Sequence, residues 1–407
     1  MVKQQYQCPD EDDIEDVEKY RRGGFHPIHI GDVLRENFRV LHKLGCGGFS
    51  TVWLARDLMD HLLYAIKVFA ADAPRDELNI YHLLDAVGVH PNVSNLHGHF
   101  TIQGPNGSHQ CLVLSVLGPS IKQIQHSKFT AELKQDISKQ IACGLSHLHR
   151  AGICHGDLTH ANVLLGLRDV SRWSDSEVYQ RLGAPNTAQL LRLDGSLPPP
   201  CAPKHIVEAI QFKNIDPGLL SGSVCIVDFG LSFLTEHPPP GIPGTPYSFL
   251  APELCFGAPR SPSNDIWALG CLIFELYTGR LLFPVIFDRF DILVGTIVNT
   301  LGRLPLHWEG HFVNQTDRIF EPGQKDFWFD PSFEPEKPLK TIAGQCPQPQ
   351  KRLLLELLAG LLSLDPSNRP TAAETISYFP SSPGDTQTTV QTRHPVHGQT
   401  IVDRHSS

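Results

Sequence analysis

The strongest local signal in this chain of 407 residues is the stretch HGDLTHANVLL, residues 155–165. Its Asp157 and Asn162 lie five residues apart, directly before the apolar run that begins at Val163 and predicts a strand. An aspartate and an asparagine on one loop can serve as a proton acceptor and as a metal ligand. The sequence therefore predicts a chemical site at the start of this strand.

A second carboxylate follows the apolar run 224–227, at Asp228 of Asp228-Phe229-Gly230. Gly230 permits the sharp turn that directs Asp228 back toward a cleft, because glycine adopts conformations that other residues avoid. Oxygen ligands from two neighbouring strand ends suit Mg²⁺, which takes few protein carboxylates and keeps positions for phosphate oxygens. We therefore expect Asn162 and Asp228 to hold a magnesium ion.

A glycine-rich segment upstream, LGCGGFSTV at residues 44–52, lies between two predicted strands. Gly45, Gly47 and Gly48 let backbone N–H groups approach a phosphate, since glycine has no Cβ. Taken alone, this segment fits an ordinary hairpin with a flexible turn equally well. Lys67, in the strand pattern AIKV of residues 65–68, can hold the phosphates of a nucleotide or can be a solvated residue of an edge strand.

Composition excludes several classes of protein. The 34 Lys and Arg residues against 43 Asp and Glu residues give a net charge of −9, which excludes the basic surface of a dedicated nucleic-acid-binding protein. The ten cysteines form no Cys-x-x-Cys pair and the first residues are no signal peptide, so we expect a soluble intracellular protein with free thiols. The longest apolar runs, 266–276 and 353–364, are shorter than the ~20 residues of a membrane span and each contains a glutamate, which predicts two core helices.

The spacing of apolar residues divides the chain into parts. Residues 1–24 are polar, and the acidic run 10–18 predicts a mobile, solvated extension. Strand patterns dominate from residue 38 to about 115, and beyond residue 118 the pattern becomes helical, with Thr130 as the expected N-cap of a helix. Residues 167–222, rich in Pro, Ser and Gly, form a long insertion that we expect to be functional or disordered.

The motifs occur in the order found in the eukaryotic protein kinase family, which the sequence resembles over residues 38–379. Segments 23–32 (GGFHPIHIGD), 49–55 (FSTVWLA) and 116–120 (VLGPS) are similar to the SR-protein kinases, and the insertion is similar to that of their divergent fungal branch. Seven motifs carry the family resemblance: the glycine-rich loop, Ala65-Ile66-Lys67, His155-Gly156-Asp157 with Asn162, Asp228-Phe229-Gly230, Ala251-Pro252-Glu253, DIWALG at 265–270 and Asn368-Arg369-Pro370.

The resemblance implies an α+β, bilobal protein kinase fold with a small, antiparallel β-rich N-lobe at 38–117 and a larger, mainly helical C-lobe at 118–380 that contains the insertion 167–222. An acidic extension at 1–37 precedes the lobes, and a disordered tail at 381–407 follows them. The implied activity is transfer of the γ-phosphoryl group of ATP, with Mg²⁺, to Ser or Thr of protein substrates, of which Arg/Ser-rich proteins are candidates. We further expect a monomer in the cytoplasm or nucleus, with no direct contact to nucleic acid or membrane.

The resemblance also implies a role for each residue of the catalytic motifs. Asp157 orients the substrate hydroxyl and accepts its proton, whereas Asn162 and Asp228 hold Mg²⁺. Lys67 pairs with a helix glutamate, for which Glu77 is the candidate although only ten residues separate the two.

The remaining implied roles concern adenine and the architecture of the C-lobe. Leu114 occupies the gatekeeper position, and the Ser115 carbonyl and Leu117 N–H make the backbone bonds to adenine. Two contacts are expected to be structural, an ion pair of Glu253 with Arg369 and a cap by Asp265 on the backbone of the catalytic loop. The side chains expected to enclose adenine are Leu44, Val52, Ala65 and Leu164.

Three positions depart from the family pattern. Ser50 replaces a glycine, as in the SR-protein kinases. Gly156 stands where many kinases carry an arginine that pairs with a phosphate, so we expect packing to hold the activation segment 228–253 and activity to be independent of phosphorylation. Thr159 replaces a lysine that contacts the γ-phosphate, a loss for which a protonated His160 would compensate only partly. The alternative to an active kinase is therefore an ATP-binding pseudokinase or scaffold with little turnover.

Overall fold

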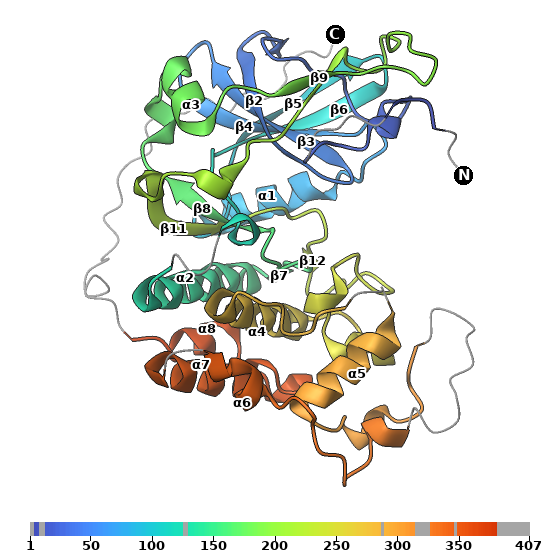
Figure 1. Ribbon diagram of the computed structural model, residues 1–407, viewed down its shortest axis with the longest axis vertical. Helices are drawn as coiled ribbons and strands as arrows, with labels where there is room; N and C mark the ends of the chain where they lie inside the picture. The colour runs from blue at the N-terminus through green and yellow to red at the C-terminus, as the bar shows by residue number, and fades with distance from the viewer. Residues whose placement is uncertain are drawn as a thin grey trace.

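The computed structural model describes residues 4–7, 13–124, 129–285, 289–313, 326–345 and 348–380. These residues form two lobes, with an antiparallel sheet in the upper lobe and packed helices in the lower lobe (Figure 1). The α+β, two-lobed fold expected from the sequence is confirmed.

The N-lobe sheet has six strands in the order β1-β2-β3-β4-β6-β5. Residues along a strand alternate between the two faces of a sheet, so Ala65 and Lys67 of β4 point to the same side. Lys67 lies opposite Val52 of β3, and Ala65 lies opposite Leu114 of β6. This register gathers residues of the expected nucleotide site on one face. The elements of the lobe are β1 (Val33–Leu34), β2 (Phe38–Cys46), β3 (Ser50–Asp57), β4 (Leu63–Phe69), α1 (Asp76–Val87), β5 (Leu96–Gly104) and β6 (Gly107–Leu114).

The C-lobe combines helices with two short antiparallel ladders, β7 with β12 and β8 with β11. The Thr130 side chain accepts the Leu133 N–H at the start of α2, which confirms the expected N-cap. The two long apolar runs lie mainly in α4 and α7, and both helices bury side chains in the core. The elements are α2 (Ala131–Arg150), β7 (Ile153–Cys154), β8 (Val163–Leu167), β11 (Leu220–Ile226), β12 (Phe233–Leu234), α4 (Pro262–Thr278), α5 (Phe290–Leu301), α6 (Leu339–Ile342), α7 (Gln348–Leu361) and α8 (Ala372–Ile376).

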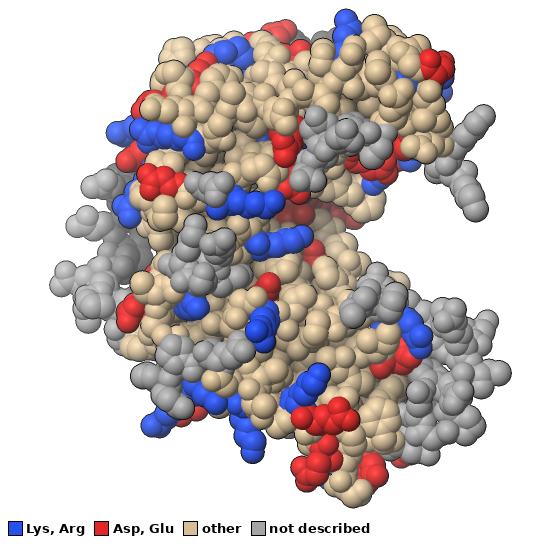
Figure 2. Space-filling view, in the orientation of Figure 1, with Lys and Arg blue, Asp and Glu red and all other residues tan. Residues whose placement is uncertain are grey.

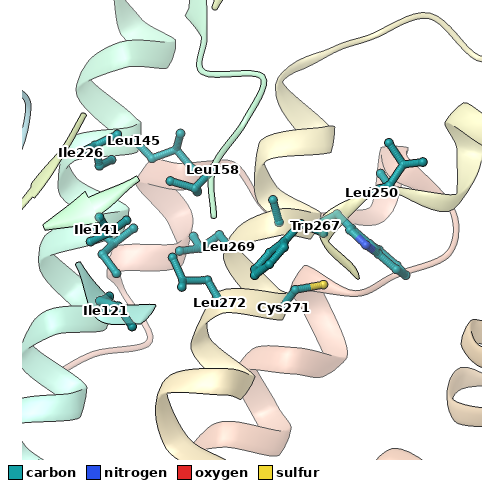
Figure 3. Close-up of a cluster of buried hydrophobic side chains, with 14 of the residues drawn as sticks. Ile121, Ile141, Leu145, Leu158, Ile226, Leu250, Trp267, Leu269, Cys271 and Leu272 are labelled. Carbon is teal, nitrogen blue, oxygen red and sulfur yellow. The ribbon is translucent and has the colours of Figure 1, made fainter. Parts of the chain in front are cut away.

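The core between α2 and α4 anchors the loop that carries Asp157. Ile141 and Leu145 of α2 face Leu269 of α4, and all three side chains are fully buried (Figure 3). Leu158, the residue after Asp157, inserts into the same apolar cluster. Burial of one leucine contributes about 2 kcal/mol, so displacing this loop would cost apolar burial as well as hydrogen bonds.

The insertion is ordered and packs on the N-lobe. It contains α3 (Asp175–Leu182) and the paired strands β9 (Thr187–Gln189) and β10 (His205–Val207). The Asp175 carboxylate accepts hydrogen bonds from Arg39 of β2 and, at 2.7 Å, from Arg56 of β3. Trp173 is buried against apolar residues of β2 and β3. Of the two expectations for this segment, disorder is therefore wrong.

The N-terminal segment corrects another expectation. Residues 4–7 and 13–24 are not a solvated extension, because Tyr6, Val17 and Tyr20 are buried. Glu15, a member of the acidic run, is 4% exposed and forms an ion pair with buried Lys43. The segment has too few apolar residues to give a periodic pattern of apolar positions. Its apolar residues nevertheless pack against the core of the folded lobes.

Two expectations lie outside the described residues, namely the disordered tail at 381–407 and the part of the acidic run at 10–12. Among the helices of the described ranges, none combines the length and the apolarity that crossing a bilayer requires.

Candidate active site

Lys67 is the centre of an ion-pair cluster under the sheet. Its Nζ donates to the two carboxylate oxygens of Glu77, at 2.8 and 2.7 Å, and to Oδ1 of Asp228 at 3.0 Å. Burial alone would lower the pKa of Lys67, but the charges of Glu77 and Asp228 outweigh it and hold the pKa above its ordinary value. The amine therefore stays charged at neutral pH and can attract an anion.

The start of α1 accommodates the short spacing between Lys67 and Glu77. Glu77 is the second residue of that helix and is 3% exposed, so no preceding turn is needed to bring its carboxylate under the sheet. Tyr81, four residues later and thus on the same helix face, packs edge-on against Phe229 at 5.1 Å. The pairing that the sequence left uncertain is present in the structure.

Asp228 is held in an uncommon conformation. Its φ of 66° lies in the left-handed region, and the Gly230 N–H donates to its Oδ1 at 3.2 Å. Phe229 is 1% exposed, between the rings of Tyr81 and His155. Burial would raise the pKa of Asp228, but Lys67 and the Gly230 N–H hold it below its ordinary value. The side chain is half exposed, so a charged oxygen faces the cleft, as a cation site requires.

Asp265 of α4 fixes the backbone of the catalytic loop. Its buried carboxylate accepts the N–H of His155 at 2.8 Å and of Gly156 at 2.9 Å. It also lies 2.9 Å from Nε2 of His149 on α2. A carboxylate that binds backbone N–H groups from a buried helix holds the loop rigidly, which is the structural role expected for Asp265.

The same loop brings Asp157 and Asn162 together. Asn162 Nδ2 donates to Oδ2 and to the backbone carbonyl of Asp157, both at 2.8 Å, which leaves its amide oxygen for a cation. Oδ1 of Asp157 is buried and has no hydrogen-bond partner of normal geometry among the described residues, so its capacity to accept a bond is unused. Burial raises the pKa of Asp157 to about 6, although His155, Thr245 and Asn162 act in the opposite direction. A perturbed carboxyl group of this kind is typical of a functional site.

The glycine-rich turn between β2 and β3 leaves open space for a ligand. Gly45 pairs with Val52 across the hairpin, and the Gly47 N–H donates to the Ser50 carbonyl at 2.9 Å. A Cβ built at Gly45 or Gly47 would meet nothing within 4 Å. The turn therefore satisfies the steric requirement for a phosphate cradle.

The residues expected to enclose adenine lie on two sides of the connection between the lobes. Ala65 is buried and Val52 is half-buried on the sheet, whereas Leu164 is half-buried on β8. Leu44 is also half-buried, and it packs against the cluster formed with the insertion. Val52 and Ala65 thus lie on the paired strands β3 and β4 beside Lys67, and Leu164 pairs with Ser120 in the segment that joins the lobes.

Ser115 and Leu117 lie in the segment that follows β6 and joins the lobes. This segment pairs with β8, since the Gly118 N–H donates to the Leu165 carbonyl at 2.8 Å. His97 of β5, which the sequence did not indicate, has Nε2 at 2.8 Å from Oγ of Ser115. No sequence pattern connects these two residues, because only the sheet brings them together.

Thr159 is uncharged and His160 is engaged by a carboxylate. The Thr159 side chain is 3% exposed, and its Oγ1 accepts the Ala161 N–H at 3.3 Å. Nδ1 of His160 lies 2.7 Å from both carboxylate oxygens of Glu275 on α4. Partial compensation by His160 therefore gains no support, because Glu275 engages the ring.

The activation segment is bound directly to the catalytic loop. Oγ of Ser232 donates to the His155 carbonyl at 2.8 Å, and Oγ1 of Thr245 donates to the Gly156 carbonyl at 2.8 Å. Gly156 has a φ of 78°, and a Cβ there would lie 2.5 Å from the Leu231 carbonyl oxygen. An arginine at this position is thus incompatible with the observed packing. Gly156 is the one residue in the sequence that pointed toward this packing, and the hydroxyl contacts themselves could not be predicted.

Figure 2 shows a recess between the lobes with acidic side chains at its inner wall.

The expected ion pair of Glu253 with Arg369 lies deeper in the C-lobe. Nη1 and Nη2 of Arg369 donate to the two carboxylate oxygens of Glu253, both at 2.7 Å. Both side chains are nearly inaccessible to solvent. A bidentate pair of this kind fixes the end of the activation segment to the helical core.

Comparisons with known proteins agree with this geometry. The family model described as "Protein kinase domain" matches residues 38–187 and 213–378. A serine/threonine-protein kinase SRPK from Physarum polycephalum is 31% identical, over 72% of this chain and 73% of its own. A serine/threonine protein kinase from Aspergillus fumigatus is 27% identical over 88% of both chains.

Two further matches are more limited. Human SRSF protein kinase 3 is 34% identical over 43% of this chain and 34% of its own. The crystal structure of a kinase domain superposes with a TM-score of 0.60 at 20% identity, over 86% of this chain and 97% of the other, which supports the fold alone. The family model and the relatives together show that the chain belongs to the protein kinase family and is similar to the serine/threonine-protein kinases of the SR-protein kinase type.

Proposed function

We propose that this protein transfers the γ-phosphoryl group of ATP to serine or threonine side chains of protein substrates. One observation carries the proposal: Lys67, paired with Glu77, contacts Asp228, and the loop below presents Asp157 with a free buried oxygen. A fixed cation, carboxylates that can hold Mg²⁺ and a proton acceptor in one cleft are the parts that phosphoryl transfer requires.

Each of these residues has a defined task in the proposed reaction. Lys67 holds the α- and β-phosphates, and its pair with Glu77 keeps the ammonium group in place. Asp157 accepts the hydroxyl of the substrate at Oδ1, while the bond from Asn162 to Oδ2 fixes the orientation of the carboxylate. With a pKa of about 6, Asp157 is ionised at neutral pH and can still take up a proton.

The donor set fits a magnesium nucleotide. Asp228 offers a half-exposed carboxylate with a lowered pKa, and Asn162 keeps its amide oxygen for a cation. When bound, Mg²⁺ neutralises charge on the phosphate oxygens of ATP. These residues are oxygen donors of the kind that Mg²⁺ prefers.

The substrate class is also a proposal. The similarity to kinases named for SRPK and SRSF supports Arg/Ser-rich proteins as substrates. We further propose that the protein acts as a monomer in the cytoplasm or the nucleus, on protein and not on nucleic acid or membranes.

One observation favours a second candidate, an ATP-binding scaffold with little turnover. Thr159 is uncharged and His160 is engaged by Glu275, so neither offers an unpaired cation for the γ-phosphate. Losing one such charge contact costs about 1–3 kcal/mol of transition-state stabilisation, roughly ten- to a hundredfold in rate. This is a smaller loss than removal of the base, so we favour an active, slower kinase.

The test is phosphoryl transfer from labelled ATP to a panel of Arg-Ser, basic and acidic peptides. We expect label on serine or threonine of the Arg-Ser peptides and none with the Asp157→Ala variant. Equal labelling by parent and variant would show that the activity comes from elsewhere. Binding of Mg-ATP without transfer to any peptide would favour the scaffold.

A further inference from the structure

We infer that residues 13–25, here called the N-terminal clamp, hold the glycine-rich loop over the nucleotide site, with Lys19 as the positioning residue. The inference rests on the proposed function, because the ligand of the loop is taken to be a magnesium nucleotide. The match to the family model begins at residue 38, after this segment, although Gly23, Gly24 and Phe25 at its end belong to the stretch 23–32 that is similar to the SR-protein kinases.

The clamp is itself firmly attached to the N-lobe. The Gly23 and Gly24 carbonyls accept the Asp72 and Ala71 N–H groups, at 2.7 and 3.0 Å, between β4 and α1. A Cβ at Gly24 would lie 1.8 Å from the Lys19 carbonyl oxygen, so the chain can fold back here only with glycine. The position of Lys19 is therefore set by a tight turn.

Two buried contacts add to this attachment. The Glu15 carboxylate binds Nζ of Lys43, and the Tyr20 hydroxyl donates to the same carboxylate. Lys43 immediately precedes Leu44 at the start of the glycine-rich segment. Lys43 also contacts the insertion, because its Nζ donates a hydrogen bond to the Val207 carbonyl at 3.1 Å. The clamp thus reaches both the base and the tip of the glycine-rich hairpin.

Lys19 makes the contact with the tip. Its Nζ donates to the Gly48 carbonyl and lies 5.7 Å from the centroid of the Phe49 ring. The Phe49 residue is 62% exposed, so its ring is held by few neighbours, whereas its backbone carbonyl accepts the Ala70 N–H at 2.8 Å. A charged hydrogen bond together with a cation–π contact limits how far the tip can swing away from the sheet. The ammonium group also adds positive charge beside a turn that we propose binds phosphates.

Three variants test this role. Lys19→Met keeps the length and apolar stem of the side chain but removes its charge, whereas Lys19→Arg keeps the charge. Arg22→Met removes one charge from an exposed position of the same segment and serves as the matched control. Amide hydrogen exchange of residues 45–50, measured without nucleotide, reports on the loop directly. The affinity for Mg-ADP by calorimetry and the steady-state constants for Mg-ATP report on the consequence.

We expect Lys19→Met to speed exchange at residues 45–50 severalfold. It should also weaken Mg-ADP binding and raise the KM for Mg-ATP about three- to tenfold, which corresponds to about 0.7–1.4 kcal/mol. The kcat should stay within about twofold, because the contact exists before and during the reaction. Lys19→Arg should restore the parental values, and Arg22→Met should not change them.

Unchanged exchange and KM in Lys19→Met would overturn the inference. Equal effects of Lys19→Met and Arg22→Met would also overturn it, because a general loss of positive charge would then explain both. If the parent bound no nucleotide, the proposed function would fail, but the exchange of residues 45–50 would still decide whether Lys19 restrains the loop.

Discussion

Replacing Asp157 by asparagine should stabilise the folded protein while it removes the proposed base. The pKa of this carboxyl group rises from its ordinary value of 3.8 to about 6, chiefly through burial. At neutral pH the group is ionised in both states, but its charge is less favourable in the folded protein. A pKa difference of about 2 corresponds to about 3 kcal/mol, which is the maximum that Asp157→Asn can regain. The amide oxygen can still accept the hydrogen bond from Asn162, so the variant leaves that donor satisfied.

The sign of the pH dependence follows from the raised pKa. Well below pH 3.8 the group is protonated in both states, and parent and variant should be equally stable. Between about pH 4 and 6 the unfolded parent loses its proton first, so the parent loses stability relative to the variant. Above pH 6 the difference should remain constant at about 1–3 kcal/mol in favour of Asp157→Asn.

The assay is denaturant-induced unfolding of nucleotide-free parent and variant at several values between pH 4 and 8. Comparing the two proteins at each pH cancels the contributions of all other titrating groups. A variant that is equally or less stable than the parent at pH 7 would refute the reasoning, because Asp157 would then carry no burial cost. A difference in unfolding free energy between the two proteins that stays the same at every pH would also refute the reasoning.

Three further predictions concern binding, regulation and architecture. Lys67→Met should abolish the thermal stabilisation that Mg-ATP gives the parent, and it should also lower the Tm without nucleotide, because Glu77 is left buried without its partner. Equal stabilisation of both proteins by Mg-ATP would remove Lys67 from the site. Phosphatase-treated protein should be as active as untreated protein, since Ser232 and Thr245 already bind the catalytic loop directly; a large loss on treatment would contradict this. Arg369→Met should lower the free energy of unfolding by about 3–5 kcal/mol, because it leaves the Glu253 carboxylate buried without its partner. A loss under about 1 kcal/mol in denaturant-induced unfolding would contradict this prediction.

The catalytic residues could be predicted because short motifs fix their local geometry. Asp157 and Asn162 share one loop, and Gly230 accompanies Asp228, so spacing alone places each oxygen near a strand end. The pairing of Lys67 with Glu77 was harder to predict, because it depends on where α1 begins. Such a boundary is set by the tertiary packing of the helix and not by its own sequence.

The contacts that could not be predicted join segments far apart in the chain. The N-terminal segment looked solvated because its polar residues dominate, although Tyr6 and Tyr20 are buried and Glu15 has an ionic partner 28 residues away. The ordered insertion was missed for the same reason, since Asp175 meets its arginines only across the lobe. An ion pair of high sequence separation leaves no periodic signal that could be read from the sequence.

The central claim, that this cleft performs phosphoryl transfer despite Thr159, is tested most directly by the turnover of Thr159→Lys. Its rate of label transfer from ATP to an Arg-Ser peptide should be compared with that of the parent and of Asp157→Ala. The restored cation should raise kcat about ten- to a hundredfold, with a smaller change in nucleotide affinity, because the benefit lies mainly in the transition state. Binding of Mg-ATP by the parent and by Thr159→Lys, with no transfer above the Asp157→Ala background on any peptide, would contradict the claim and leave a nucleotide-binding scaffold.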